Sequence, residues 1–166
     1  LPVRGTTQCF QARAQDNASN VGGFSAAACT AVPLHHSQIG VGQPVSYSGT
    51  WSPVTQTASY LGSYRQATTT GAFVQVAGIK ARRLALVVGR CPTCGSVAVT
   101  WTPTGGAAVS LGTINLAAAT TTYKQVVNLG TAAFASVQTG TLKVTVNSIG
   151  GKTVRIEGIG ITKSGV

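Results

Sequence analysis

The residues most able to carry chemistry in this sequence are two cysteines in the stretch GRCPTCG at residues 89–95. Cys91 and Cys94 could form a redox centre, half of a metal site or a disulfide across a turn. A redox CxxC lies at a helix N-terminus, where the helix dipole lowers the pKa of the thiol. Here the motif joins two alternating stretches, RRLALVVGR and GSVAVTWT. We therefore expect a disulfide that staples a turn.

A metal site is the alternative for these cysteines. A structural zinc site would need two further ligands, and their spacing in this chain fits no common zinc motif. The candidates would be Cys9 and Cys29, or His35 and His36. Because adjacent side chains of an extended backbone point to opposite sides, we do not expect both histidines to chelate one ion. The sequence predicts no metal and no cofactor.

The other two cysteines predict a second disulfide. Cys9 and Cys29 each lie about ten residues from the centre of the polar turn NASN at residues 17–20. A hairpin folded about that turn places them opposite each other, and the closed loop would be worth about 3 kcal/mol. Four cysteines in two local pairs indicate an oxidising compartment, so we expect an extracellular or cell-surface protein.

Acid–base catalysis is limited by a shortage of carboxylates. Asp16 and Glu157 are the only acidic residues. A glycosidase of the usual kind needs two carboxyl groups about 5–10 Å apart, and a calcium site needs several together. A hydrolytic triad needs a nucleophile, a base and an orienting group. The sequence therefore predicts a protein that is not an enzyme.

The charge balance is strongly basic. Twelve Lys and Arg against two acids produce a formal net charge of +10, which attracts anionic polymers. The cations are scattered, and no motif of a nucleic-acid-binding fold accompanies them, so we do not expect sequence-specific nucleic-acid binding. Lys80, Arg82 and Arg83 cluster at a turn entering a strand. They could bind anionic glycans or phosphates, or form a solvated edge that blocks strand pairing.

The elements that must position these residues are short strands. Period-two alternation in RRLALVV places Leu84, Leu86 and Val88 on one face. GSVAVTW, TLKVTV and KTVRIEGIGI alternate in the same way, and glycine-containing breaks separate them. About eight such strands predict an antiparallel all-β sandwich. No apolar run reaches the ~18–20 residues of a membrane span.

Three segments are expected along the chain. Residues 1–32 form a β-hairpin, residues 33–44 a linker, and residues 45–166 the sandwich. Two strands are not stable alone. The hairpin must therefore pack on the sandwich, pair with another chain, or belong to a domain that is cut away.

The stretch GTWSPVTQTASYLGSYRQATTTGAFVQVAGIKARRLALVVGRCPTCGSVAVTW, with TVRIEGIGI, resembles the jelly-roll, galactose-binding-like modules of secreted actinobacterial proteins. The resemblance covers about residues 45–166. It rests on the positions Trp51, Tyr60, Gly62, Tyr64, Gly71, Cys91, Cys94 and Gly158.

The first segment, CFQARAQDNASNVGGFSAAACTAVPL, resembles the last two strands of a fibronectin type III or immunoglobulin-like module. Ser19 replaces a usual Gly, and Phe24–Ser25 replaces Trp–Ser. His35–His36 replaces a usual acidic pair, which weakens any calcium role. Together the two resemblances imply a tandem array of non-catalytic extracellular modules.

Aromatic and basic side chains are the candidates for ligand binding, because an aromatic ring stacks on the apolar face of a sugar. Trp51, Tyr64 and Trp101 could instead lie in the core, and Tyr60 is the aromatic residue expected to be most exposed. The candidate ligand-binding set is Tyr60, Tyr64, Lys80, Arg82, Arg83 and Trp101.

Two functions remain open on the sequence. One is an extracellular adhesion module that binds carbohydrate or another anionic surface polymer. The other is a structural subunit of a filament, surface layer or virion surface, in which residues 1–32 make strand-mediated contacts with neighbouring subunits.

Overall fold

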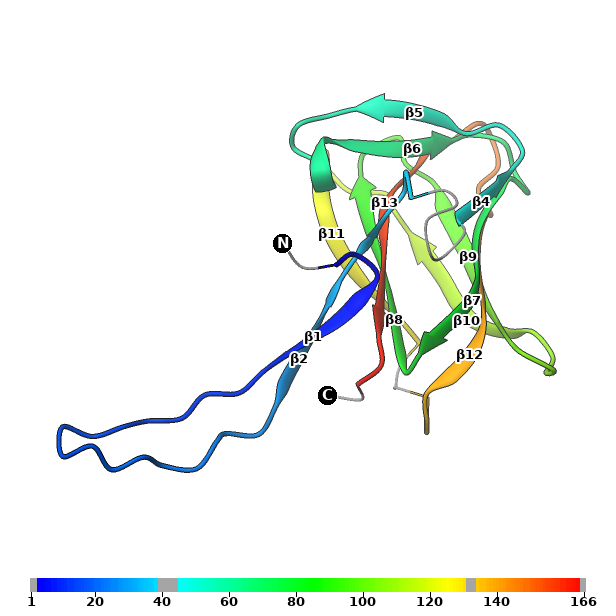
Figure 1. The fold of residues 1–166 in the computed structure, drawn as a ribbon. Helices are drawn as coiled ribbons and strands as arrows, with labels where there is room; N and C mark the ends of the chain where they lie inside the picture. Colours follow the sequence, from blue (N-terminus) through cyan, green and yellow to red (C-terminus); the bar gives the residue numbers. More distant parts are fainter. Residues whose placement is uncertain (1–2, 39–44, 131–133, 165–166) are drawn as a thin grey trace.

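The computed structural model describes residues 3–38, 45–130 and 134–164. Two antiparallel sheets form a β-sandwich, and a two-stranded arm projects from it (Figure 1). The strands are β1 (Thr6–Phe10), β2 (Ala28–Val32), β3 (Leu34–His35), β4 (Val45–Ser48), β5 (Ser52–Thr55), β6 (Ser63–Ala67), β7 (Phe73–Ala81), β8 (Arg83–Arg90), β9 (Ser96–Pro103), β10 (Val109–Asn115), β11 (Thr122–Leu129), β12 (Gln138–Val146) and β13 (Val154–Thr162). A 3-10 turn, η1 (Tyr60–Gly62), precedes β6.

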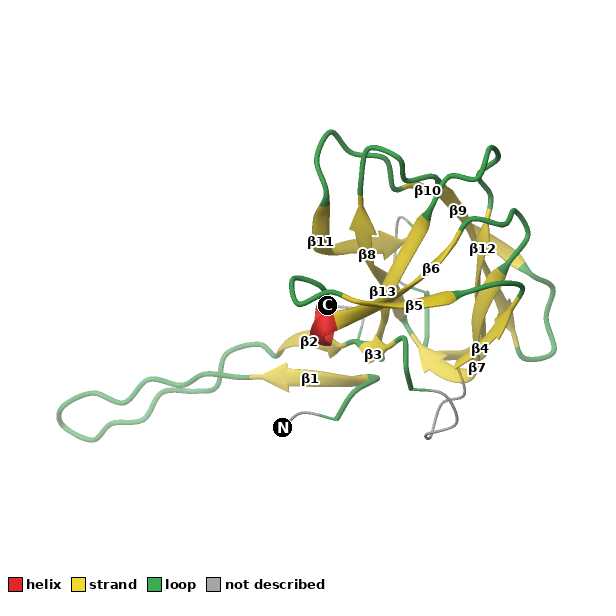
Figure 2. Ribbon diagram, turned by 90° about the horizontal axis from the view of Figure 1, so that it is seen from above, coloured by secondary structure: helices red, strands yellow, loops and turns green. Residues whose placement is uncertain are grey.

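The strand order is that of a jelly roll. One sheet has the order β10-β9-β12-β7-β4, and the other has β11-β8-β13-β6-β5, with β3 also paired to β13. The chain crosses between the sheets from β7 to β8, from β8 to β9, and again at each connection from β10 to β13. Figure 2 shows the sandwich from above. The predicted antiparallel β-sandwich is confirmed.

The core lies between the sheets and is built by the predicted alternation. Leu84, Leu86 and Val88 of β8 are all buried in it. The same holds for the alternating residues of three other strands: Val97, Val99, Trp101, Leu142, Val144, Val146, Val154 and Ile156. A β-bulge between Ile156 and Gly158 then shifts the register of β13. Beyond it, Ile159 and Ile161 are the core residues.

Both predicted disulfides are present. Cys9 and Cys29 are register partners in the β1–β2 ladder, and their sulfurs are bonded. Cys91 and Cys94 are bonded across the turn between β8 and β9, and both are buried. The described part of the chain contains no free cysteine.

The arm is docked at its base and free beyond it. The backbone N–H of Lys163 donates to the hydroxyl of Thr7 at 2.8 Å. Leu34 of β3 lies close against β13 at Gly158. A Cβ on Gly158 would lie 2.7 Å from the carbonyl oxygen of Leu34, so this contact requires glycine. Residues 11–27 are exposed (Figure 1).

The arm differs from the sequence expectation in the extent of its strands. The regular ladder ends at Phe10 and Ala28, and the rest of the expected hairpin is an irregular ribbon with an isolated bridge between Gln15 and Val21. At its tip, Asp16 accepts hydrogen bonds from the backbone N–H groups of Ala18 and Asn20, both at 2.9 Å. These bonds close the predicted turn.

Part of the predicted linker has regular structure. Leu34 and His35 form β3 and pair with Ile159 and Gly158 of β13. Residues 39–44 of the predicted linker lie outside the described residues, and the division into domains stays a prediction. No helix among the described residues is long and apolar enough to cross a membrane.

Candidate functional site: a polar cleft at one end of the sandwich

A cleft of about 460 Å³ opens at the end of the sandwich where β9 and β13 begin and β10 and β12 end. Strand pairing brings these segments together, since Asn115 is the register partner of Ser96, and Val146 pairs with Val97. The lining residues are Cys94, Gly95, Ser96, Asn115, Ala117, Asn147, Ser148, Ile149 and Lys152.

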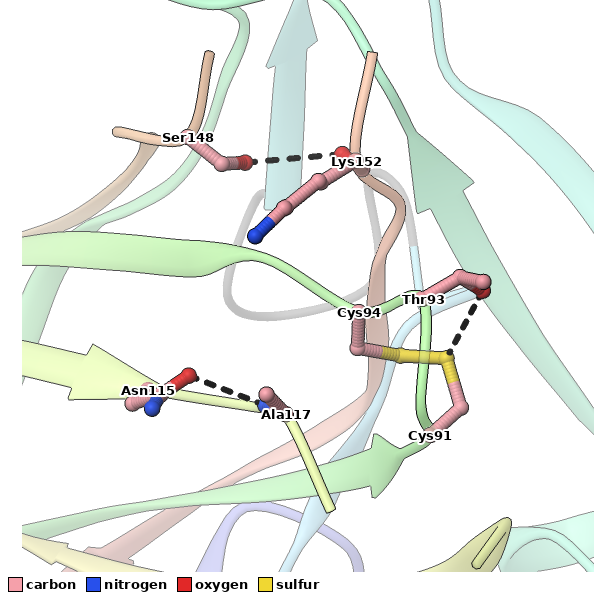
Figure 3. Close-up of a disulfide and its surroundings, with 7 residues drawn as sticks. All are labelled: Cys91, Thr93, Cys94, Asn115, Ala117, Ser148 and Lys152. Atoms are coloured by element: carbon pink, nitrogen blue, oxygen red, sulfur yellow. Dashed lines mark hydrogen bonds between the residues drawn. A yellow bond between two sulfur atoms is a disulfide. The ribbon is translucent and has the colours of Figure 1, made fainter. Parts of the chain in front are cut away.

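The Cys91–Cys94 turn ties the walls of the cleft together (Figure 3). The N–H of Leu116 donates to the carbonyl of Gly95 at 2.8 Å, and the N–H of Gly95 donates to the carbonyl of Thr153 at 2.9 Å. One wall follows β10 and the other precedes β13. The disulfide turn therefore sets the spacing between them.

Gly95 allows the walls to approach closely. A Cβ at this position would clash with the side chain of Ser148 and lie 3.0 Å from the Cβ of Lys152. Ser148 is buried, and its hydroxyl donates to the carbonyl of Lys152 at 3.4 Å. Any residue larger than glycine must displace this wall.

The side chains of the cleft suit a ligand with many hydroxyl groups. Asn115 accepts a hydrogen bond from the N–H of Ala117 with its Oδ1 at 3.0 Å, and this bond leaves the two amide donors available. Asn147 is exposed beside it. Ile149, with 79% of its surface exposed, adds an apolar rim. The site can donate and accept hydrogen bonds and can cover an apolar ring face.

Two of the sequence-predicted ligand residues are buried. Trp101 is 1% exposed, stacks on Phe134 at 5.4 Å, and donates its indole N–H to Gln138. Tyr64 is 5% exposed and carries the guanidinium of Arg155 over its ring at 5.5 Å. Both residues therefore pack inside the protein and do not present a ring to a ligand. This agrees with the alternative stated above, that Tyr64 and Trp101 lie in the core.

Tyr60 is half-buried at the base of the arm. Its hydroxyl donates to the carbonyl of Pro33 at 2.9 Å, and its backbone N–H donates to the carboxylate of Glu157 at 2.6 Å. Burial raises the pKa of the Tyr60 hydroxyl. These contacts connect the arm, η1 and β13, so Tyr60 joins three elements and lies away from the cleft lining.

The predicted basic cluster lies at the turn between β7 and β8, as expected. Lys80 and Arg83 are exposed. Arg82 donates from its Nε to the carbonyl of Phe134 at 3.1 Å, which holds a neighbouring segment. Lys80 pairs with Thr139 near the start of β12, whereas the cleft lies at the end of that strand. The cluster and the cleft are therefore at opposite ends of the sandwich.

The two histidines do not point to opposite sides, and that expectation is wrong. Their ring centroids are 4.1 Å apart, and both are buried. The Nε2 atoms of His36 and His35 lie 2.9 Å and 3.4 Å from the hydroxyl oxygen of Ser63. The alternation fails because β3 ends at His35 and the chain turns at once.

The contact between the Ser63 hydroxyl and His36 resembles the nucleophile–base pair of a hydrolase, but the other features of such a site do not accompany it. Burial, followed by the charges of His35 and Arg65, lowers the pKa of His36 to about 4, which makes it a weak base. Its buried Nδ1 has no hydrogen-bond partner in the described part of the chain. No group of three or more metal-ligating residues occurs there either.

Sequence reasoning missed the polar residues that carry the cleft's side-chain chemistry. Ser96 and Lys152 lie at the starts of the predicted runs GSVAVTW and KTVRIEGIGI, Asn147 directly follows TLKVTV, and Asn115 ends β10, which none of the named runs covers. The available signal was a polar residue at one end of three of these alternating runs. What was lacking was the strand order that brings these ends together.

No family model matches the sequence, and no curated protein matches it. The solved structures with a similar fold include a xanthan lyase from Paenibacillus (TM-score 0.57, 9% identity), a family two carbohydrate esterase from Cellvibrio japonicus (0.50, 11%) and a family 43 arabinoxylan arabinofuranohydrolase from Bacillus subtilis (0.50, 11%). The matches cover 87%, 95% and 92% of this chain, but only 14%, 34% and 33% of those proteins. At this identity the similarity shows a shared β-sandwich.

Proposed function

We propose that this chain is a non-catalytic extracellular module that binds carbohydrate in the cleft at the end of the sandwich and thereby mediates adhesion. The observation that carries the proposal is the cleft itself. Neutral amide and hydroxyl groups from Asn115, Asn147 and Ser96 converge there beside the exposed Ile149. Sugar-binding sites combine a few placed polar groups with apolar surface in this way.

The wider molecule supports the same proposal. The fold occurs in proteins that act on carbohydrates, and the two disulfides suit an oxidising compartment. The resemblance to secreted actinobacterial modules, and of residues 1–32 to the end of an immunoglobulin-like module, agrees with an array of extracellular domains. Carbohydrate binding needs no paired carboxylates, and this chain has only two acidic residues.

The test is titration calorimetry of the protein against neutral and acidic oligosaccharides, repeated with Gly95→Ala and Asn147→Ala. We expect one class of oligosaccharide to bind and Gly95→Ala to weaken that binding at least tenfold, about 1.4 kcal/mol, because the Cβ displaces the wall at Ser148. Asn147→Ala removes an exposed side chain without a steric clash. It reports on the cleft even if Gly95→Ala folds poorly.

The matched control is Gly105→Ala, because Gly105 lies in a turn with open space around its Cβ position. Its positive φ of 75° adds backbone strain but leaves the cleft intact. Binding that persists in both cleft variants, or no binding to any oligosaccharide, contradicts the proposal.

The second candidate function is the structural subunit, and the exposed arm favours it. Phe10 and Phe24 are 64% and 63% exposed on the arm, and Val21 is 49% exposed at its tip. Large apolar side chains on a projecting ribbon are typical of a surface that contacts another molecule. In this function residues 1–32 would contact a second copy of the chain, and head-to-tail repetition would form a polymer.

Light scattering of the native protein tests this second function. If the arm drives assembly, particles much larger than the 16.7 kDa monomer form, and the double variant Phe10→Ser/Phe24→Ser returns them to monomers. The sandwich should remain folded, since both side chains lie outside its core. A monomer at all concentrations, in buffer of high ionic strength, contradicts the subunit function.

A further inference from the structure

We propose that the ligand of the cleft is an acidic sugar, and that the amine of Lys152 binds the carboxylate of a uronic acid residue. This inference rests on the proposed function of the same cleft and names its ligand class.

Among the described residues that line the cleft, Lys152 is the only charged one, so this lining has one cationic side chain and no anionic side chain. Of the two acidic side chains in the sequence, Asp16 is at the tip of the arm, and Glu157 is fully buried and accepts hydrogen bonds from the backbone N–H groups of Tyr60 and Lys124. A negative group that enters the cleft therefore meets an ammonium group and no opposing charge.

The position of Lys152 fits this role. Its main chain is held on the cleft wall, because its carbonyl accepts a hydrogen bond from Ser148, and its Cβ is 3.0 Å from the position that a Cβ on Gly95 would take. The side chain is exposed and extends from that wall, with its amine directed toward the side of the cleft where Ser148 and Asn115 lie (Figure 3). A fixed base and a free amine suit a charge-assisted hydrogen bond.

The remaining groups favour a uronate over a more highly charged ligand. Asn115, Asn147 and Ser96 supply neutral donors and acceptors, which match ring hydroxyls. A single ammonium balances one carboxylate, whereas densely sulfated or phosphorylated ligands are usually held by several cations. One charge surrounded by hydroxyls is the pattern of a hexuronic acid.

Long-range attraction is the competing explanation for any acidic preference. The net charge of +10 attracts every polyanion, whatever the cleft contains. The exposed Lys80 in the basic cluster at the opposite end of the sandwich separates the two effects. Lys152→Gln and Lys80→Gln each remove one positive charge, so both lower the net charge by the same amount. Only Lys152→Gln also removes the ammonium group from the cleft.

The experiment measures the affinity of the wild type, Lys152→Gln and Lys80→Gln for oligogalacturonate, a neutral galacto-oligosaccharide of equal length, and dextran sulfate. We expect the wild type to prefer oligogalacturonate to the neutral sugar. We expect Lys152→Gln to lose about tenfold or more of the oligogalacturonate affinity, because a hydrogen bond to a charged group is lost. Lys80→Gln and the neutral sugar should show almost no change.

Three results overturn the inference. Equal wild-type affinity for the acidic and neutral sugars, with no effect of Lys152→Gln, removes the acidic preference but leaves the proposed carbohydrate function standing. Equal losses in both lysine variants assign the preference to the overall field. Stronger, Lys152-dependent binding of dextran sulfate changes the ligand to a sulfated sugar. Absence of all sugar binding instead refutes the proposed function.

Discussion

Glu157 shows most clearly how one residue organises its surroundings. Its fully buried carboxylate accepts the N–H of Tyr60 at 2.6 Å and the N–H of Lys124 at 3.1 Å and 3.2 Å. Lys124 has a φ of +55°, an unfavourable conformation for a lysine, which this contact helps to hold. Burial raises the pKa of Glu157, and the two backbone hydrogen bonds oppose that rise. The residue is therefore structural.

Glu157→Gln should destabilise the protein by about 1–3 kcal/mol, because one acceptor oxygen becomes an amide donor that faces a backbone N–H. Thermal unfolding followed by circular dichroism measures the change. The matched control is Asp16→Asn, which removes the same charge at the exposed arm tip and should leave the melting temperature of the sandwich unchanged. Equal melting temperatures for the two variants would show that Glu157 does not hold η1 and β11 on β13.

At the scale of elements, the turn between β8 and β9 connects several parts of the chain. The Cys91 N–H donates to the carbonyl of Leu116, and Cys94 forms a bridge with Thr153. The turn therefore joins the end of β10 to the start of β13. Its disulfide is buried under the cleft, unlike Cys9–Cys29, which lies on the arm.

Replacing Cys91 and Cys94 by alanine should cost about 2 kcal/mol by the loop-entropy relation and weaken ligand binding, because the cleft walls lose their spacing. Replacing Cys9 and Cys29 by alanine should destabilise the β1–β2 arm, where the loop closure of about 3 kcal/mol acts, and should leave the unfolding midpoint of the sandwich and the ligand affinity unchanged. Urea unfolding and calorimetry of the two double variants provide the comparison. Similar effects in both would mean that the CxxC disulfide does not shape the cleft.

At the scale of the whole molecule, charge and shape favour different partners. Of the two acidic side chains, Asp16 at the arm tip is exposed and places one negative charge on the surface, whereas Glu157 is buried. Hydrogen bonds from Asn20 lower the pKa of Asp16. Copies of this chain therefore repel one another at low ionic strength. Assembly through the arm would strengthen with added salt, whereas binding of an acidic sugar would weaken.

The sequence by itself determined the features that depend on neighbouring residues. The period of two placed Leu84, Leu86 and Val88 on the core face, because successive side chains of a strand alternate. Both disulfides followed from local geometry: one lies across a short turn, and the other is centred on the polar turn of the arm. Net charge follows directly from composition.

Only the tertiary structure decided the site. The cleft draws Ser96, Asn115, Asn147 and Lys152 from four separate segments, which meet because β9 pairs with both β10 and β12 and the Cys91–Cys94 turn reaches β13. Strand order depends on long-range packing, and no local period records it. For the same reason the sequence left the burial of Trp101 open. The histidine pair was misplaced for a different reason: β3 ends at His35, so the alternation of an extended strand does not apply to His36.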